Sequence, residues 1–129
     1  MSDPTGIAAY QQGHIQVQAA AASPIEQVLM LMNGFNDEID RLHGHIVSGS
    51  SAKKAESVTV LMNILDVLDT SLDMEQGGKL AQDIHEQYTD TGNRVFKASQ
   101  DNDTEQLVTA KNVMTTLKEG WEGVEKNLR

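Results

Sequence analysis

The fold is indicated first by residues 25–46, which read IEQVLMLMNGFNDEIDRLHGHI. Apolar side chains recur in this stretch at alternating intervals of three and four residues: Ile25, Val28, Met32, Phe35, Ile39, Leu42 and Ile46. That spacing puts them in one narrow row along a helix, which is typical of helices that pack against antiparallel neighbours. Residues 25–46 therefore predict one helix of a bundle.

The C-terminal stretch repeats the pattern with Leu107, Ala110, Met114, Leu117, Trp121, Val124 and Leu128. Between these two rows the chain predicts further helices over about residues 52–74 and 79–100, separated by Gly77-Gly78. The inward-facing row of the third helix is predicted to be Leu80, Ile84, Tyr88, Val95 and Ala98. Ser23-Pro24-Ile25-Glu26 is a capping box that starts the first helix, and Asp103 is suited to cap the last. Short connections favour antiparallel neighbours, so we expect an all-α, antiparallel four-helix bundle over residues 23–129.

Residues 1–22 differ from the rest of the chain. Asp3 is their sole Asp, Glu, Lys or Arg, and Ile7, Tyr10, Ile15 and Val17 are among their few large apolar residues. This segment holds too little apolar surface to fold alone. We expect an N-terminal arm that is either loose or docked on the bundle.

Composition excludes several classes of function. Nineteen Asp and Glu residues against ten Lys and Arg residues give a net charge of −9, which disfavours nucleic acids and anionic membranes as partners. The absence of cysteine excludes disulfides and thiolate catalysis. No signal peptide and no apolar run of about 18 residues is recognisable, so we expect a cytoplasmic protein without membrane insertion.

The second predicted helix is more apolar than one contact requires. Besides a row that includes Leu61, Leu65 and Leu68, it carries a second row, Val60, Ile64 and Val67. Burying three aliphatic side chains is worth about 5–9 kcal/mol, so this second row is expected to meet the arm or a partner's helix. An acidic side chain at position 64 is then expected to abolish partner binding without unfolding the bundle.

No set of residues indicates catalysis, a metal site or a cofactor. His14, His43, His45 and His85 lack a common ligand spacing, and Asp40-x-x-His43 is an isolated match to a di-iron motif. The alternative is a histidine phosphotransfer domain or another helical interaction module, with His43 as phosphoacceptor beside the small Gly44. Asp40, one turn earlier, would oppose phosphoryl transfer by its charge. The residues therefore favour a protein that is not an enzyme.

Short motifs spread along the chain resemble the flagellin export chaperones of the FliS family. They are Ala9-Tyr10, Ala22-Ser23-Pro24, Leu29-Met30-Leu31-Met32-Asn33-Gly34, Leu72-Asp73-Met74-Glu75-Gln76-Gly77-Gly78 followed by Leu80-Ala81, Asn102-Asp103 and Gly120-Trp121. The match is collinear over almost the whole chain. It implies a bacterial cytoplasmic chaperone that binds the disordered C-terminal segment of flagellin, prevents premature polymerisation and aids type III flagellar export.

The resemblance assigns roles to particular residues. The cargo is expected to lie on the second row and on nearby positions of the third helix, which gives a partner-binding set of Val60, Ile64, Val67, Ile84, Tyr88 and Val95. Ile7 and Tyr10 are expected to plug that surface when cargo is absent. Whether export-gate components or an anti-sigma factor also dock is left open.

The third helix departs from the family pattern. Asp90 stands where a second aromatic residue is usual, Thr91-Gly92 follow where long apolar residues are common, and Ser99 replaces the usual Asn. A more polar groove between the second and third helices is therefore expected.

Overall fold

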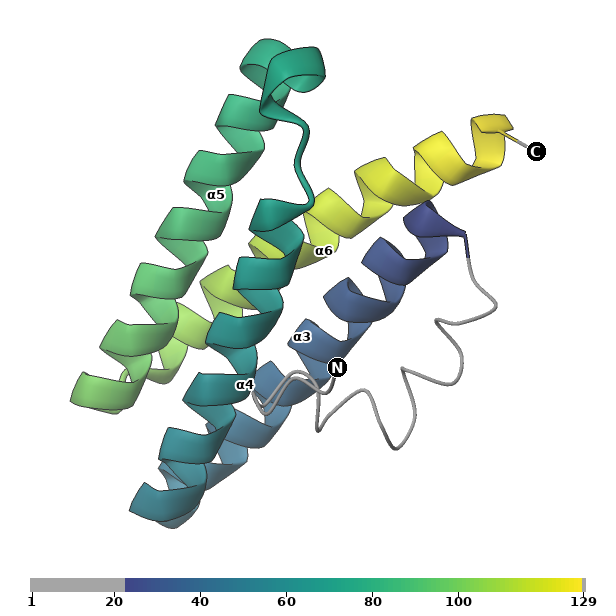
Figure 1. Ribbon diagram of the computed structural model, residues 1–129. Helices are drawn as coiled ribbons and strands as arrows, with labels where there is room; N and C mark the ends of the chain where they lie inside the picture. The colour runs from purple at the N-terminus through teal and green to yellow at the C-terminus, as the bar shows by residue number, and fades with distance from the viewer. Residues whose placement is uncertain (1–22, 129) are drawn as a thin grey trace, which may run out of the picture.

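The computed structural model describes residues 23–128, with side chains through residue 124. Over that range its regular structure consists of four helices, labelled as in Figure 1: α3, Pro24–Ser48; α4, Ser51–Thr70; α5, Met74–Asp101; and α6, Thr104–Leu128. The connections are short, and consecutive helices run in opposite directions. The predicted all-α four-helix bundle is confirmed, while the predicted arm, residues 1–22, lies outside the described residues.

The predicted capping box starts α3. Ser23 Oγ accepts the backbone N–H of Glu26 at 3.2 Å, and the Glu26 carboxylate accepts the backbone N–H of Ser23 at 2.9 Å. These two bonds satisfy N–H groups that the first turn of a helix leaves without partners. At the other end Gly49 adopts φ +71°, a left-handed conformation that glycine takes without strain. The first helix therefore agrees with its prediction at both ends.

The boundary between the second and third helices differs from the prediction. Helix α4 stops at Thr70, not at residue 74, and α5 begins at Met74, not at residue 79. The hydroxyl of Ser71 donates to the Leu68 carbonyl at 2.7 Å, and the Asp73 carboxylate accepts the Gln76 N–H at 2.9 Å. Asp73 is therefore an N-cap that the sequence analysis had placed inside a helix.

The predicted glycine break occurs inside α5. Gly78 has φ +53° and ψ −130°, a combination that residues with a Cβ avoid, so the first turn of α5 is set off from the rest. Residues 73–80 are all exposed. The turn before Gly78 therefore adds little to the core.

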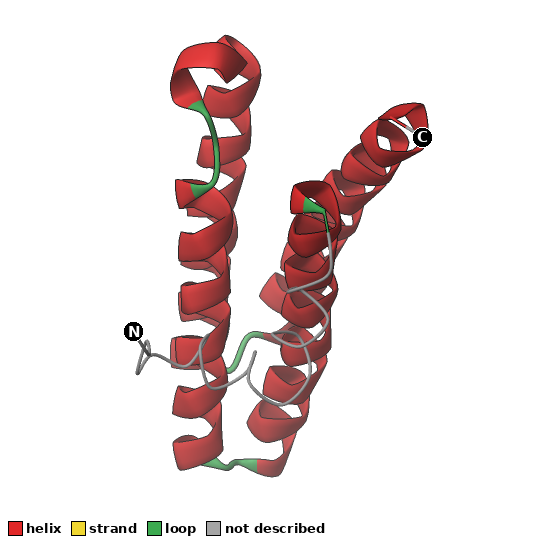
Figure 2. Cartoon of the chain, turned by 45° about the vertical axis from the view of Figure 1, so that its right-hand side comes forward, coloured by secondary structure: helices red, strands yellow, loops and turns green. Residues whose placement is uncertain are grey.

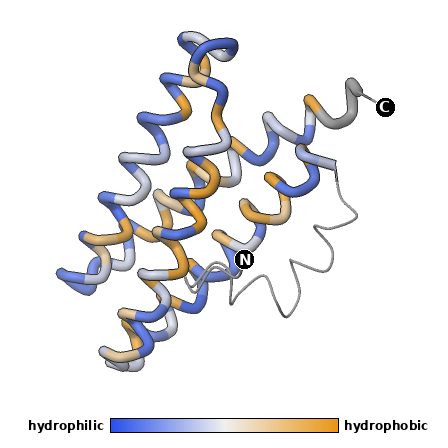
Figure 3. Tube along the Cα trace, in the orientation of Figure 1, coloured by the Kyte–Doolittle hydropathy of each residue, from blue (hydrophilic) through white to orange (hydrophobic). Residues whose placement is uncertain are grey.

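The core lies along the inner sides of all four helices, where Figure 3 shows the hydrophobic colour concentrated. Its largest fully buried apolar side chains are Met32, Phe35, Leu42, Leu61, Ile64, Leu68, Val95, Leu107 and Met114. Most of them belong to the rows that the spacing predicted. No helix among residues 23–128 has the combined length and apolar character needed to cross a bilayer.

The four helices form a ring of contacts in which α3 and α5 each pack between α4 and α6. The α4–α5 pair and the α3–α6 pair lie close at one end and spread apart at the other (Figures 1 and 2). We call the end with the α3–α4 and α5–α6 turns the closed end. The open end is where α5 begins and α6 finishes.

Candidate partner-binding surface

The second row of α4 faces α3. Ser57, which precedes Val60 by three residues and so lies on the same side of the helix, donates its hydroxyl to Glu38 of α3 at 2.6 Å. Ile64 has no exposed surface, whereas Val60 and Val67 are half-buried at the margin of the core. The centre of the row is therefore buried, whereas its two ends remain partly accessible.

A buried carboxylate fixes the register of α3 on α4. Glu38 is 7% exposed, and besides the Ser57 hydroxyl it accepts the Arg41 guanidinium at 2.9 Å. Burying a charged group is costly unless donors satisfy it, so sliding one helix along the other would strand this carboxylate. Val60 and Val67 are held at fixed heights along α3 for that reason.

The structure corrects the interpretation of Ile64 as part of a spare face. Ile64 is a core residue with no exposed surface, so other residues of this chain already cover it. The apolar spacing had predicted that the arm or a partner's helix would cover it. Of the second row, Val60 and Val67 alone present surface without movement of a helix.

The three predicted partner-binding residues of α5 also lie inside the bundle. Ile84 is 9% exposed, Tyr88 is 4% exposed and Val95 has no exposed surface. A partner could touch them only if helices moved apart. Their part in partner binding stays a prediction. Unless helices move apart, they can contribute only by packing beneath residues that a partner touches.

Tyr88 links three helices. Burial, followed by the nearby negative charge of Asp69 on α4, raises the pKa of the Tyr88 phenol to about 12, and a hydrogen bond from Trp121 of α6 acts in the opposite direction. The phenol is therefore neutral at physiological pH. Trp121, a member of the predicted C-terminal apolar row, is half-buried and packs against the core.

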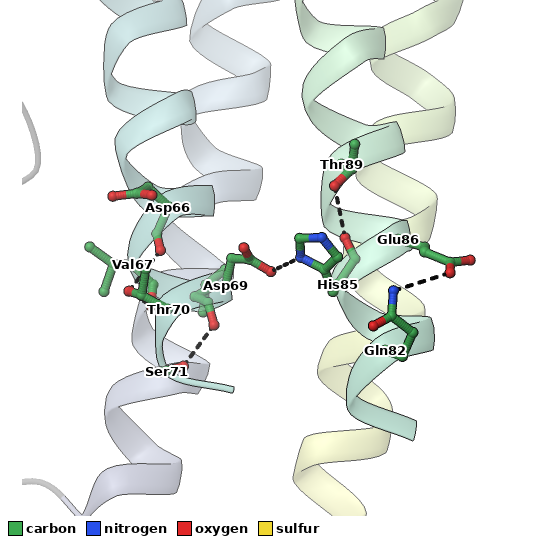
Figure 4. A network of polar contacts seen from close by, with 10 residues as sticks. Asp66, Val67, Asp69, Thr70, Ser71, Gln82, His85, Glu86 and Thr89 are labelled. Atoms are coloured by element: carbon green, nitrogen blue, oxygen red, sulfur yellow. Dashed lines mark hydrogen bonds and ion pairs between the residues drawn. The ribbon is translucent and has the colours of Figure 1, made fainter. Parts of the chain in front are cut away.

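Helices α4 and α5 also join through a polar contact near the open end, shown in Figure 4. The Asp69 carboxylate lies 2.6 Å from Nδ1 of His85, and both side chains are partly exposed. Around this pair the Thr70, Ser71 and Thr89 hydroxyls donate to carbonyls of their own helices. Asp69 therefore joins α4 to α5.

The Thr91-Gly92 departure does not open the contact between α4 and α5. Gly92 is buried, and a Cβ added there would lie 3.1 Å from Cε of Met62 and 3.5 Å from Cδ1 of Leu65. The flexible Met62 side chain fills the space that a larger residue on α5 would take. Asp90 points away from this contact, is exposed and pairs with Arg94 at 2.8 Å.

The histidines form no metal site among residues 23–124. No group of three His, Cys, Asp or Glu side chains there has a geometry suited to a metal ion. His43 is exposed, and Asp40 beside it is paired with Lys111 of α6 at 2.8 Å. His14 and the predicted arm plug, Ile7 and Tyr10, lie outside the described residues.

The structure adds exposed apolar residues that the sequence analysis missed. Leu80 had been placed in the buried row of the third helix, yet it is 68% exposed. The other large exposed apolar residues of the described chain are Val47, Met74, Phe96, Val108 and Val124. Spacing indicates the side on which such residues lie, but it does not reveal whether a neighbouring helix reaches them.

Comparison with known proteins identifies the family. The model of the family described as flagellar protein FliS matches residues 6–128. The flagellar secretion chaperone FliS of Salmonella typhimurium is 28% identical over 125 residues, which cover 96% of this chain and 93% of that protein. FliSB of Pseudomonas aeruginosa is 28% identical over 89% of this chain, and FliS of Vibrio cholerae is 27% identical over 90% of it; the matches cover 91% and 85% of those proteins.

These relatives are named as chaperones rather than enzymes, which agrees with the absence of catalytic motifs in the sequence and disfavours the phosphotransfer alternative at His43. The family match spans nearly every residue of the four helices and their connections. This chain belongs to the FliS family of flagellar secretion chaperones.

Proposed function

We propose that this protein holds the C-terminal segment of newly made flagellin in the cytoplasm, prevents its premature polymerisation and delivers it for type III flagellar export. The observation that carries the proposal is the family match over residues 6–128, together with relatives that are named flagellar secretion chaperones. A chaperone of this kind needs no catalytic group. It needs apolar surface that a partner's amphipathic segment can cover.

Val60 and Val67 are the residues of the predicted set that can offer such surface directly. They are half-buried, seven residues apart, and therefore about two turns from one another on the same side of α4. Apolar residues of a bound helix recur at the same interval, so one cargo helix can contact both. Ile64 lies between them in sequence, and its packing in the core holds this part of α4 in place.

Ordering a disordered cargo segment costs conformational entropy, which limits affinity and allows release at the export machinery. In our proposal the arm competes for the same surface through Ile7 and Tyr10. Any free energy gained when the arm docks is subtracted from the affinity for cargo, because cargo must first displace it. Export-gate components or an anti-sigma factor remain further proposed partners of the loaded or empty chaperone.

Calorimetric titration with a flagellin C-terminal peptide tests the proposal. We expect the full-length protein to bind the peptide, and the double substitution Val60→Ser, Val67→Ser to weaken binding at least tenfold, because about 1.4 kcal/mol corresponds to that factor. Val47→Ser, Val108→Ser is the matched control, since it removes two exposed valines of α3 and α6. Circular dichroism checks that each variant is folded.

Absence of peptide binding by the full-length protein would contradict the proposed function. Equal weakening by the two double variants would leave the function standing but contradict the assigned surface. Replacing Tyr10 by Ala is expected to strengthen or leave unchanged the affinity for peptide if the arm only plugs the site.

A further inference from the structure

Helices α5 and α6 leave an open groove between them. It has a volume of about 500 Å³ and is lined by Asp83, Glu86, Gln87 and Asp90 of α5 and by Val113 of α6. The groove lies between a different pair of helices from Val60 and Val67, and the cargo proposal above makes no use of it.

One wall of this α5–α6 groove continues into apolar surface that no neighbouring helix covers. Leu80 precedes Ile84 by four residues and Asp83 by three, so it stands beside both on α5. Ile84 is 9% exposed, whereas Leu80, which is four residues nearer the start of α5, is 68% exposed. A leucine on an inward-facing side of a helix is thus left in water.

The α6 wall is apolar along the same direction. Val113, Leu117 and Val124 are separated by four and seven residues, which places them on one side of the helix. Val113 and Leu117 are half-buried, and Val124 is 44% exposed. Gly120 belongs to the same row, and a Cβ added there would meet no atom within 4 Å. The backbone of α6 is therefore within reach of another helix at Gly120.

The rim of the groove is acidic. Asp83 and Asp90 are each paired with a cation on their own helix, Lys79 at 3.1 Å and Arg94 at 2.8 Å, in exposed pairs that bind weakly. Glu86 is exposed and accepts a bond from the neutral Gln82 side chain at 3.3 Å. A partner that brings its own cations can therefore compete for these carboxylates.

We propose that the α5–α6 groove binds an amphipathic helix of a partner protein whose apolar row is flanked by Lys or Arg. The apolar row covers Leu80, Val113 and Val124, and the cations meet Asp83, Glu86 and Asp90. The acidic rim favours this occupant over three others: a second copy of this chain, an anionic bilayer and residues 1–22. A second copy of this chain carries −9 and an anionic bilayer is negative, so the rim repels both, and residues 1–22 contain no Lys or Arg.

The probe is a designed amphipathic peptide of about 18 residues, or five helical turns, with a leucine row flanked by arginines. A matched peptide carries glutamate at the arginine positions. Fluorescence anisotropy with the full-length protein gives the two affinities, and amide shifts of the isotope-labelled protein locate the site. We expect the arginine peptide to bind, with shifts along α5 and α6, and to weaken with added salt.

Matched variants separate this groove from general attraction to an acidic protein. Leu80→Ser is expected to weaken the arginine peptide about tenfold, whereas Val47→Ser, at a 71% exposed position of α3, leaves it unchanged. Asp83→Asn with Glu86→Gln is expected to weaken it as well. Asp37→Asn with Glu56→Gln removes the same charge from exposed positions of α3 and α4 and leaves the affinity unchanged.

Three outcomes would overturn the proposal: equal affinity for the two peptides, shifts confined to other helices, or equal losses in the groove variants and their controls. Self-association that Leu80→Ser abolishes, or binding to anionic vesicles through the groove, would replace the proposed occupant with another. The flagellin peptide is expected to bind simultaneously with the arginine peptide. The two titrations can therefore fail separately, and failure of one proposal leaves the other intact.

Discussion

Between α3 and α4, apolar side chains are covered through the middle of the interface and a buried carboxylate locks the register, whereas between α5 and α6 the contact gives way to an open groove. Ile64 shows the first case, with no exposed surface, and Leu80 shows the second, with 68% of its surface exposed. Both were placed by the same spacing rule. The spacing of apolar residues therefore indicates direction, and the course of the neighbouring helix decides burial.

The largest effect is expected on the covered side of the comparison, from a substitution at Ile64. Ile64→Asp places a carboxylate in the core without a donor, so we expect a loss of more than about 4 kcal/mol and an unfolded protein. This reverses the expectation from sequence, in which an acidic residue at position 64 left the bundle intact. Circular dichroism and urea unfolding measure it, with Val47→Asp as the control at an exposed position of α3. A folded Ile64→Asp variant would contradict the placement of Ile64 in the core.

A pair of leucines compares the two ends of the α5–α6 interface. Leu107 is 1% exposed at the closed end, and Leu80 is 68% exposed at the open end. We expect Leu107→Ala to cost about 2–5 kcal/mol and Leu80→Ala about 0.5 kcal/mol or less, because the first leaves a cavity and the second does not. Urea unfolding of both variants measures the difference. Equal losses would mean that α6 covers Leu80 in solution.

A third effect, smaller than the loss expected for Ile64→Asp, appears at high pH. Below pH 10 the Tyr88 phenol is protonated in both the folded and the unfolded chain, so it adds no pH dependence. As the pH rises from 10 toward about 12, the unfolded chain loses this proton while the folded chain keeps it. The free energy of unfolding then falls by up to about 2.7 kcal/mol, from two pH units at 1.36 kcal/mol each.

The Tyr88→Phe variant is expected to lack this fall. Urea unfolding at about pH 8 and about pH 11 compares it with the unmodified protein, and the difference between the two proteins should shrink at the higher pH. The measurement at about pH 8 corrects for loss of the Trp121 hydrogen bond. A pH dependence that is the same in both proteins would show that Tyr88 ionises freely and that the closed bundle does not bury it.

Local rules predicted much of the fold. Ser23 and Pro24 begin a helix because their own side chains suit its first turn, and Gly78 breaks one because of its own backbone freedom. Asp73 escaped prediction because Leu72 continues the apolar row of α4, which made the cap look like the interior of a helix. Thr70 and Ser71, which end α4, also fell inside the range 52–74 predicted for that helix.

The candidate surfaces depended on facts that one sequence does not contain. Val60 and Val67 were recognised from spacing, but the burial of Ile64, Ile84 and Tyr88 depends on which helices lie next to them. The α5–α6 groove was not foreseen at all, because it arises from the angle between two helices. One local signal pointed to this groove. It was an apolar residue close to carboxylates on the same helix, as at Leu80 and Asp83.

The isolated first turn of α5 has a consequence for how the chain can be altered. Residues 73–80 are exposed without interruption, and Gly78 separates the turn before it from the rest of the helix. Leu72 packs the link between α4 and α5 against the core, but the exposed turn over residues 74–77 is held by its Asp73 cap rather than by core packing. Extra residues inserted in this turn, or new chain ends created there by circular permutation, should be accommodated, since folded domains tolerate such changes at exposed sites.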